Sequence, residues 1–316
     1  MPDTAVHASF GQEVLRSLDG RVRETIVSAP YQIALFGPDL WFVRFPAGKH
    51  GKRGRRMHTD RTGDFLCALA RHARDGSCPE TMFSYLAGFL CHYALDAATH
   101  PYVIRKTTGE GVPSGAHRAF EHTLDILELQ RLGLWEGRHP LTRSLMPRLR
   151  LPREMREDLD AAYREVYGWK NSYRELNRLY PLFRFLYARM ENPKGLAAFL
   201  ARLTGKPVFR SLAYSESWYN GTDVENSGGE TWIHSYDESR HSAATFAHLR
   251  EQARERAVTL INACYRYIIL REIGDAELRE LIGSDSYLSG LPVRDPRNWN
   301  VSSLLPAPGA PRDDPA

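Results

Sequence analysis

Apolar residues recur at the three- and four-residue spacing of a helix along most of the chain, and no long run alternates apolar with polar residues. This pattern predicts an all-α fold, a multi-helix bundle in which no sheet is recognisable. The predicted helices are Ser9 to Leu18, Val22 to Ser28, Gly63 to Arg74, Tyr85 to His100, Ala116 to Leu132, Arg153 to Met190 with an interruption near Gly168, Lys194 to Leu203, Ser242 to Glu272 and Asp275 to Ile282.

Glycine and proline mark the predicted boundaries between these helices. The segment Phe36-Gly37-Pro38-Asp39 predicts a turn, because proline restricts the residue before it. Pro101 is expected to end the apolar helix, and Pro181 to kink a helix or start another. Residues 209 to 239 are rich in Ser, Gly, Asn and aromatic residues, which predicts an irregular segment longer than an ordinary loop.

We expect a single all-helical domain over residues 1–290, followed by a disordered, Pro-rich tail over residues 291–316. The chain has 316 residues, which is enough to bury a substantial core. Its 42% hydrophobic and 25% charged residues are typical of a soluble globular protein. The formal net charge of +4 is too small to indicate nucleic-acid binding by itself.

The N-terminal residues lack a basic stretch followed by an apolar one, so we expect no secretory signal. No apolar run approaches the ~20 residues that span a bilayer. The cysteines contain no Cys-x-x-Cys pair, which indicates neither a disulfide framework nor a thiolate zinc finger, and buried thiols are the simplest interpretation of Cys91 and Cys264. Together these features predict a cytoplasmic protein.

One predicted helix, Tyr85 to His100, is apolar almost all round yet carries His92, Asp96 and His100 at four-residue steps. Each such step advances about 6 Å along a helix and about 40° around it, so the three side chains form one slanting stripe. His117 and Glu121 form a second stripe with the same spacing. Two such helices that face each other can build a metal site in the cleft between them.

A lone buried histidine is more often a satisfied core residue than a ligand. Asp96 changes that interpretation, because a carboxylate among Phe89, Leu90 and Leu95 needs a cation or several donors to offset its desolvation. A metal ion supplies this compensation. Zinc is the preferred ion, since mixed imidazole and carboxylate ligands suit it better than calcium or magnesium.

Two segments resemble the zinc-dependent phospholipase C family, whose all-α fold is shared with fungal zinc-dependent nucleases. The segment from Gly88 to Tyr102, GFLCHYALDAATHPY, is similar to the family's motif of His, three residues, Asp and a nearby His. The segment from His117 to Glu121, HRAFE, is similar to its later motif of His, three residues and Glu. The resemblance covers about the first 130 residues.

The resemblance implies two or three zinc ions and further ligands upstream. His7 stands before the first predicted helix, Asp39 follows the Gly-Pro turn, and His58 lies in Met57-His58-Thr59. The implied ligand sets are Asp39, His58, His92 and Asp96 for one ion, Asp96 and His7 for a second ion, and His100, His117 and Glu121 for a third.

The implied reaction is phosphodiester hydrolysis by a metal-activated water that attacks phosphorus in line. Asp96 is the implied bridge between two ions, and Asp39 could orient or deprotonate the water or act only as a ligand. We therefore expect Asp39 and Asp96 to be the catalytic carboxylates.

The run from Lys49 to Arg56, KHGKRGRR, is basic, and its simplest interpretation is a solvated, flexible loop. Because it lies between Asp39 and His58, its ends are expected near the metals. Arg53, Arg55 and Arg56 are therefore weak candidates for binding the substrate, and they would attract anionic lipid headgroups or a nucleic-acid backbone.

Two groups of aromatic and polar residues are less specific. Leu40 stands where secreted relatives that prefer choline carry an aromatic residue, so a choline cage is not expected. Trp41, Phe42 and Phe45 are best interpreted as core residues. Ordinary loop packing is also the preferred interpretation of Trp218, Tyr219, Asn226, Trp232, His234 and His241, although they could line the cleft.

The sequence therefore predicts a zinc-dependent phosphodiesterase of phospholipase C type, with a phospholipid or other phosphodiester as substrate. An anionic membrane surface is a possible partner, and nucleic acid is less expected. A single-strand nuclease and a non-catalytic, metal-stabilised binding module remain open as alternatives.

Overall fold

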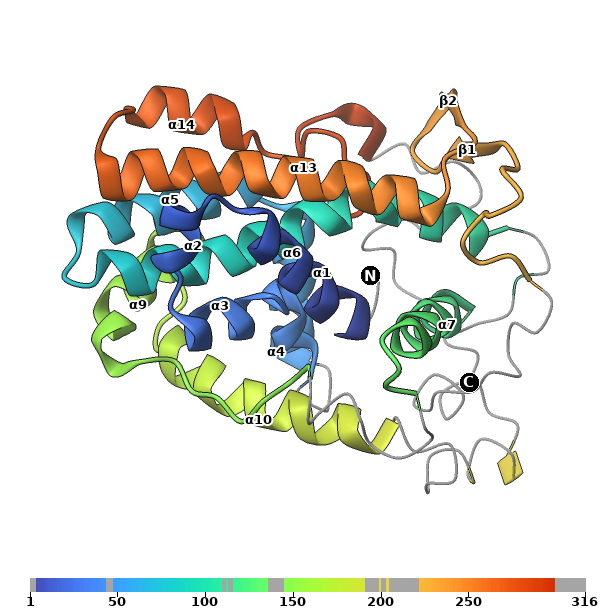
Figure 1. The fold of residues 1–316 in the computed structure, drawn as a ribbon, viewed down its shortest axis with the longest axis horizontal. Coiled ribbons are helices and arrows are strands. Elements are labelled where there is room, and N and C mark those ends of the chain that lie inside the picture. Colours follow the sequence, from blue (N-terminus) through green and yellow to red (C-terminus); the bar gives the residue numbers. More distant parts are fainter. Residues whose placement is uncertain are drawn as a thin grey trace.

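The computed structural model describes residues 4–43, 48–109, 116–135, 145–190 and 222–298, together with residues 112, 199, 203 and 204. These residues form helices and one small antiparallel hairpin, which confirms the predicted all-α fold (Figure 1). The main elements are α1 (Thr4–Ser17), α2 (Gly20–Glu24), α3 (Ser28–Ala34), η1 (Gly37–Phe42), α4 (Gly48–Thr59), α5 (Thr62–Asp75), α6 (Pro79–Lys106), α7 (Ala116–Arg131), η2 (Arg153–Met155), α9 (Arg156–Tyr167), α10 (Ser172–Met190), β1 (Trp232–His234), β2 (Asp237–Ser242), α13 (Phe246–Tyr265), the π-helical turn η4 (Arg266–Leu270), α14 (Asp275–Ile282) and η5 (Pro296–Asn298).

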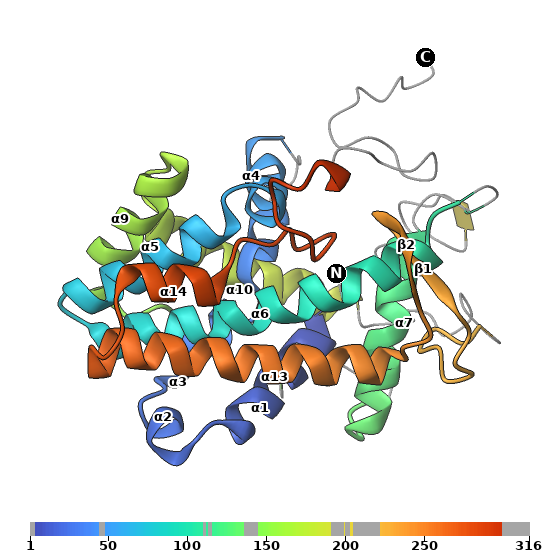
Figure 2. The same ribbon diagram turned by 90° about the horizontal axis from the view of Figure 1, so that it is seen from above.

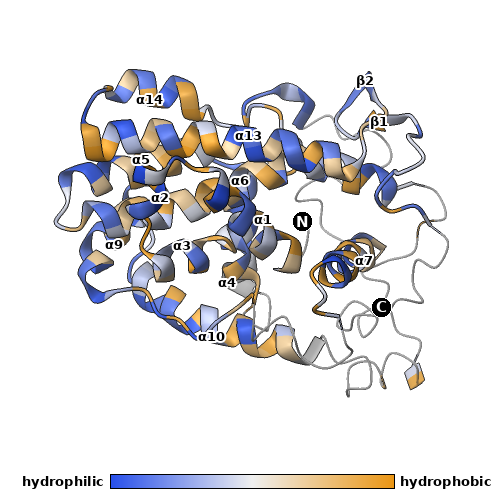
Figure 3. Ribbon diagram, in the orientation of Figure 1, coloured by the Kyte–Doolittle hydropathy of each residue, from blue (hydrophilic) through white to orange (hydrophobic). Residues whose placement is uncertain are grey.

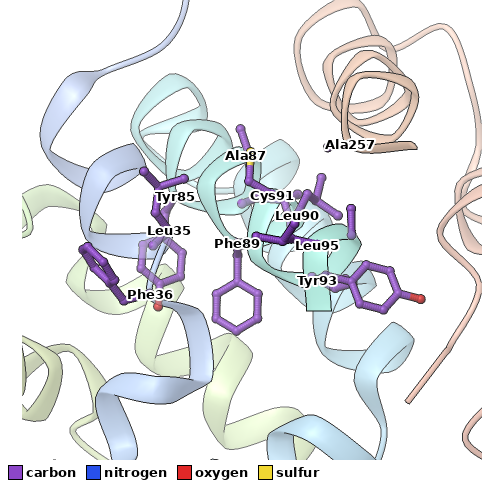
Figure 4. Packing of buried hydrophobic residues seen from close by; sticks show 14 of the residues in the cluster. Leu35, Phe36, Tyr85, Ala87, Phe89, Leu90, Cys91, Tyr93, Leu95 and Ala257 are labelled. Carbon is purple, nitrogen blue, oxygen red and sulfur yellow. The ribbon is translucent and has the colours of Figure 1, made fainter. Parts of the chain in front are cut away.

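Helix α6 runs through the middle of the molecule and is buried on nearly all sides. Helices α3, α5 and α13 pack along it, and α1 and α7 contact it as well (Figures 1 and 2). Its side chains Tyr85, Phe89 and Tyr93 point in different directions into the surrounding helices (Figure 4). A helix that is apolar all round needs neighbours on every side, and this arrangement provides them.

We expected helix α6 to end at Pro101, but it continues to Lys106. Proline has no N–H group, so it cannot bond to the carbonyl of Ala97 one turn earlier. Gly290 lies against that carbonyl, since a Cβ added at position 290 would stand 2.3 Å from the Ala97 oxygen. The Pro101 carbonyl in turn accepts a hydrogen bond from the Ser235 hydroxyl at 2.5 Å. Contacts from distant segments therefore enclose the helix where proline interrupts its ladder.

The basic run is also helical, because it lies in α4, and the expectation of a flexible loop is wrong. The Arg53 guanidinium stands 5.1 Å from the ring centroid of Trp41 and 4.7 Å from that of Trp169. Met57, one turn later, is buried. Tertiary contacts on one face thus stabilise a helix whose sequence shows little apolar periodicity.

The hairpin of β1 and β2 was not predicted, because strands of three and six residues are too short to produce a clear alternation. Trp232 pairs with Ser242, and the register shifts after Ile233. None of the helices in the described part of the chain has the length and apolar character to cross a bilayer. Cys91 and Cys264 are buried free thiols, as expected.

The chain after α14 is folded as far as residue 298, although disorder was expected from residue 291. We call residues 284–291 the C-terminal strap. The Ser286 N–H donates to the Leu291 carbonyl at 2.8 Å, and Leu291 is buried. Residues 299–316 of the predicted tail lie outside the described residues, as do residues 209–221 and most of the helix predicted from Lys194 to Leu203.

Candidate metal centre

The stripe on α6 is fully buried, and Asp96 stands at its centre. Its Oδ2 atom lies 3.0 Å from Nε2 of His92 and 3.6 Å from Nε2 of His58. Its other carboxylate oxygen, Oδ1, lies 3.2 Å from Nε2 of His7 in α1. One carboxylate is therefore surrounded by imidazoles from α1, α4 and α6.

Asp39 approaches the same cluster from the η1 turn, where its Oδ1 lies 3.3 Å from Nε2 of His58. The turn passes so close to α6 that residue 37 must be glycine. Gly37 has φ of +38°, and a Cβ added there would stand 2.9 Å from Cγ of His92. The Gly-Pro turn thus brings a carboxylate against the imidazoles of the central helix.

A second cluster lies further along α6, where His100 faces helix α7. The rings of His100 and His117 stack with centroids 6.1 Å apart, and Nε2 of His117 lies 2.8 Å from Oε1 of Glu121. The His100 side chain is fully buried, whereas the His117 side chain is 40% exposed. This cluster therefore opens towards solvent on the α7 side.

Four imidazoles are oriented by a contact at Nδ1, which leaves Nε2 directed at the carboxylates or into the cluster. These contacts join His58 to the Gly54 carbonyl at 2.8 Å, His92 to the Leu35 carbonyl at 3.0 Å, His100 to the Tyr287 carbonyl at 2.5 Å, and His117 to the Thr107 hydroxyl at 3.1 Å. A backbone carbonyl bonded to one ring nitrogen fixes the tautomer and the orientation of a metal-binding histidine.

Several buried polar atoms in these clusters have no aligned hydrogen-bond partner among the residues that the structure describes. They are Nδ1 and Nε2 of His7, Oδ1 of Asp39, Nε2 of His92, both carboxylate oxygens of Asp96, and Nε2 of His100. Leaving one such atom buried and unsatisfied costs about 1–3 kcal/mol, and more if it is charged. A cation among them would satisfy several atoms at once, so the donor set fits zinc.

The protonation states of the two clusters also suit a metal. Burial by itself would raise the pKa of Asp96, but His92 and the other imidazoles hold that pKa well below its usual range. Burial lowers the pKa of His7 and His100. Asp96 is therefore an anion and His7 and His100 are neutral, the forms in which these side chains bind metal ions.

The pKa of His58 indicates that the carboxylates around it favour a positive charge in this cluster. Burial opposes its protonation, yet its contacts with Asp39 and Asp96 raise its pKa to about 9. Two neighbouring carboxylates thus draw a proton onto this imidazole. A divalent ion would neutralise the same carboxylates and displace that proton.

The structure brings all eight predicted ligand residues together in three sets, of which the first two share His92. Within each set, one ligand atom per residue lies within 4.8 Å of every other. The sets are His7, His92 and Asp96, then Asp39, His58 and His92, and finally His100, His117 and Glu121.

The predicted substrate-binding arginines have different surroundings. Arg53 lies over the rings of Trp41 and Trp169. Arg55 and Arg56 are exposed, and Arg56 bonds to Asp60 at 2.8 Å. Among the loop residues, Trp232 is buried and donates to the Ala244 carbonyl at 3.1 Å, consistent with ordinary packing. Asn226 Nδ2 also donates to backbone carbonyls, and Nε2 of His234 lies 3.1 Å from the Ser289 carbonyl. His241 is exposed. The residues Trp218, Tyr219 and Phe45 lie outside the described residues.

Two residues that support the site were missed by the sequence analysis. Asp125 of α7 accepts hydrogen bonds from the N–H groups of Ala5 and Val6 at 2.9 and 3.0 Å, and so fixes the start of α1 next to His7. The sequence did contain a signal for Asp125, because it is a carboxylate in an apolar stretch of the predicted helix. Tyr287 acts through its backbone, which leaves no signal in the sequence.

Comparison with known proteins gives one match. A family model described as zinc dependent phospholipase C matches residues 6–176, which is more than half of the chain and contains all eight candidate ligands. No curated protein and no solved structure matches the chain.

Proposed function

Because the chain belongs to the zinc-dependent phospholipase C family, we propose that it is a zinc-dependent phosphodiester hydrolase that acts on phospholipids. The observation that carries this proposal is the group of buried nitrogen and oxygen atoms around Asp96 that have no aligned hydrogen-bond partner in the described part of the chain. Their number and chemistry are difficult to explain by packing alone. A cytoplasmic location remains a prediction.

We assign the ligands in three groups. Asp39, His58, His92 and Asp96 would hold one ion, and Asp96 would share a second ion with His7. His100, His117 and Glu121 would hold a third. The short distances from Asp96 to His7, His58 and His92, all between 3.0 and 3.6 Å, support its role as the shared ligand.

Zinc, when bound, lowers the pKa of water towards neutrality and neutralises charge that develops on phosphoryl oxygens. The chain's own groups prepare the site for this chemistry. Asp96 stays ionised because imidazoles surround it, and the Leu35 carbonyl holds the His92 ring in place. Asp39, whose side chain is 13% exposed, can accept a proton from the attacking water at the edge of the cluster.

The substitution Asp96→Asn tests this proposal. It removes the central negative charge with almost no change in shape, so turnover of phospholipid should fall at least about a hundredfold. Asp160→Asn is the matched control, because Asp160 is also buried but, within the described part of the chain, bonds only to a backbone group, the Tyr173 N–H at 2.8 Å. The control should keep turnover within about twofold, with a stability change of about 1 kcal/mol.

Product analysis and thermal unfolding of both variants separate the outcomes. Release of a phosphomonoester and diacylglycerol from phospholipid supports the proposal. Cleavage of single-stranded nucleic acid without phospholipid cleavage would replace it with a nuclease function. If D96N loses stability and the metal-loaded parent hydrolyses no phosphodiester, the chain is a metal-stabilised binding module and the proposal is wrong.

A further inference from the structure

The exposed face of α10 is basic at one end and aliphatic at the other. Arg174, Arg178, Leu182 and Leu186 follow one another at four-residue steps, and all four are exposed. Each step turns about 40° around the helix, so these side chains form one slanting face about 18 Å long. The face has no role in the metal clusters described above.

The basic end of this face contributes to a pocket of about 310 Å³. Arg150, Arg174 and Arg178 line it, and the other lining residues are Leu151, Tyr173 and Asn177, so no carboxylate lines this pocket. Among the residues that the structure describes, neither Arg150 nor Arg174 pairs with a carboxylate, whereas Nη1 of Arg178 lies 3.5 Å from Glu175. Three guanidinium groups therefore surround a space suited to a phosphate.

Hydrogen bonds fix the walls of this pocket in advance. The Leu151 N–H donates to Oδ1 of Asn177 at 2.8 Å, and the Tyr173 hydroxyl donates to the Leu151 carbonyl at 3.0 Å. The loop that carries Arg150 is thus fastened to α10 at the next residue, Leu151, through Asn177 and Tyr173. A ligand would not need to order these groups, which favours binding.

The other end of the face is apolar. Leu182 is 37% exposed, Phe185 49% and Leu186 36%. Figure 3 shows hydrophobic residues concentrated in this C-terminal half of α10. Exposed apolar residues that cluster beside basic ones are typical of helices that lie in the surface of a membrane.

We propose that this surface binds an anionic phospholipid bilayer. The docking face consists of Arg150, Arg174, Arg178, Leu182 and Leu186. Its arginines take a lipid phosphate, and its apolar residues enter the boundary between headgroups and acyl chains. Nucleic acid also offers phosphates, but it has no apolar layer to receive exposed leucines.

The opposite face of α10 contacts Phe36 beside the Asp39 turn and Arg118 of α7, residues that adjoin the two metal clusters. Tyr180 and Phe183 pack on Phe36, which directly precedes the turn of Asp39, with ring centroids 6.1 and 5.3 Å apart. Near the end of the helix, Arg118, next to His117, donates to the Tyr187 hydroxyl at 3.4 Å. A bilayer on the docking face would therefore lie about one helix diameter, ~10 Å, from both elements. The inference rests on the proposed function, because a bilayer bound to the docking face would bring the lipid substrate to the metal centre.

Co-sedimentation of the zinc-loaded protein with vesicles tests the docking face. We expect binding to vesicles of phosphatidylcholine and phosphatidylglycerol to exceed binding to phosphatidylcholine alone, and to weaken as salt rises. The triple variant R150Q/R174Q/R178Q should bind the anionic vesicles about a hundredfold more weakly, at roughly fivefold per arginine.

The matched control is R16Q/R21Q/R23Q, which removes the same charge from exposed positions on α1 and α2, away from α10 in both views (Figures 1 and 2). It should bind within about threefold of the parent. If the two triple variants lose vesicle binding equally, the loss depends on net charge and not on the docking face, and the proposal is wrong.

A second pair of variants tests the apolar end. L182S/L186S should also weaken vesicle binding at least tenfold, whereas L270S/L281S, which alters exposed leucines in η4 and α14, should not. If single-stranded DNA displaces the vesicles and L182S/L186S binds normally, the face is a nucleic-acid site and the proposal fails. Absence of anionic vesicle binding by the parent would also overturn it. Sedimentation needs no turnover, so a protein that binds vesicles but hydrolyses no lipid would refute the proposed activity alone.

Discussion

The imidazole of His92, a proposed zinc ligand, is held in one orientation by its immediate neighbours. The Leu35 carbonyl fixes one ring nitrogen, and Gly37 leaves room for the ring itself. Such neighbours typically change metal affinity by about 10- to 100-fold when they are lost. The tightness of the site therefore depends on residues that cannot bind metal themselves.

Gly37→Ala should lower zinc affinity by about 10- to 100-fold, because the new Cβ would stand 2.9 Å from Cγ of His92. Gly168→Ala is the matched control. Gly168 has φ of +72°, so alanine there meets similar backbone strain, of about 1 kcal/mol, but no atom lies within 4 Å of the added Cβ. Competition with a zinc chelator measures both affinities. Equal affinities in the two variants would contradict the role given to Gly37.

At this scale, side-chain identity and spacing indicated His92, Asp96, His100, His117 and Glu121, and the family resemblance added His7, Asp39 and His58. They did not predict what orients those ligands. The carbonyls of Leu35, Gly54 and Tyr287 belong to the backbone, and any residue type supplies one. Only the fold determines which carbonyl meets which imidazole, so this part of the site could not be predicted from the chain.

Among the elements, the C-terminal strap joins the two metal clusters, although it lies outside the segment that matches the family. The Tyr287 N–H donates to the His58 carbonyl at 2.8 Å, and the Tyr287 carbonyl meets Nδ1 of His100. Arg256 of α13 fastens the strap, since its Nη2 lies 2.6 Å from Asp285 and 3.0 Å from the Tyr93 hydroxyl. The last helices therefore help to hold ligands from the first half of the chain.

Gly290→Ala should displace the strap, because its Cβ would stand 2.3 Å from the Ala97 carbonyl oxygen. The Tyr287 carbonyl would then no longer hold His100, and we expect the protein to lose about one zinc equivalent. Gly168→Ala is again the control, with φ of +72° against +64° at Gly290 and no atom within 4 Å of its added Cβ. Elemental analysis measures the zinc content of both variants. If G290A keeps the zinc content of the control, the strap does not support the third group.

Two differences from the expected elements have one physical origin. The sequence from Lys49 to Arg56 lacks apolar periodicity, yet its helix is stabilised by arginine stacking on distant tryptophans. Pro101 is a local helix breaker, yet Gly290 and Ser235 close around the backbone there. Both effects come from residues far away in the sequence. Local patterns predicted α14 and the break at Gly168 well, because those boundaries depend on local residues.

For the whole molecule, the metal clusters and the docking face are two sides of one arrangement. α6 and its neighbours form the core that holds the clusters, and α10 covers the turn of Asp39 with its buried face. The exposed face of α10 then meets the solvent, where a membrane could approach (Figure 1). The basic run of Arg53, Arg55 and Arg56 favoured membrane attraction there instead, because a basic run is conspicuous in the sequence, whereas a stripe on one face of a helix is not.

The central claim is that the buried clusters hold zinc, and the zinc content of the purified, intact protein tests it most directly. Elemental analysis after removal of loosely bound metal should find two or three zinc ions per chain, because the ligands form three sets. Asp96→Asn, which removes the shared ligand, should lower that number by at least one, while Asp160→Asn should leave it unchanged. Less than one zinc per chain in the parent protein, with the helical fold intact, would contradict the account.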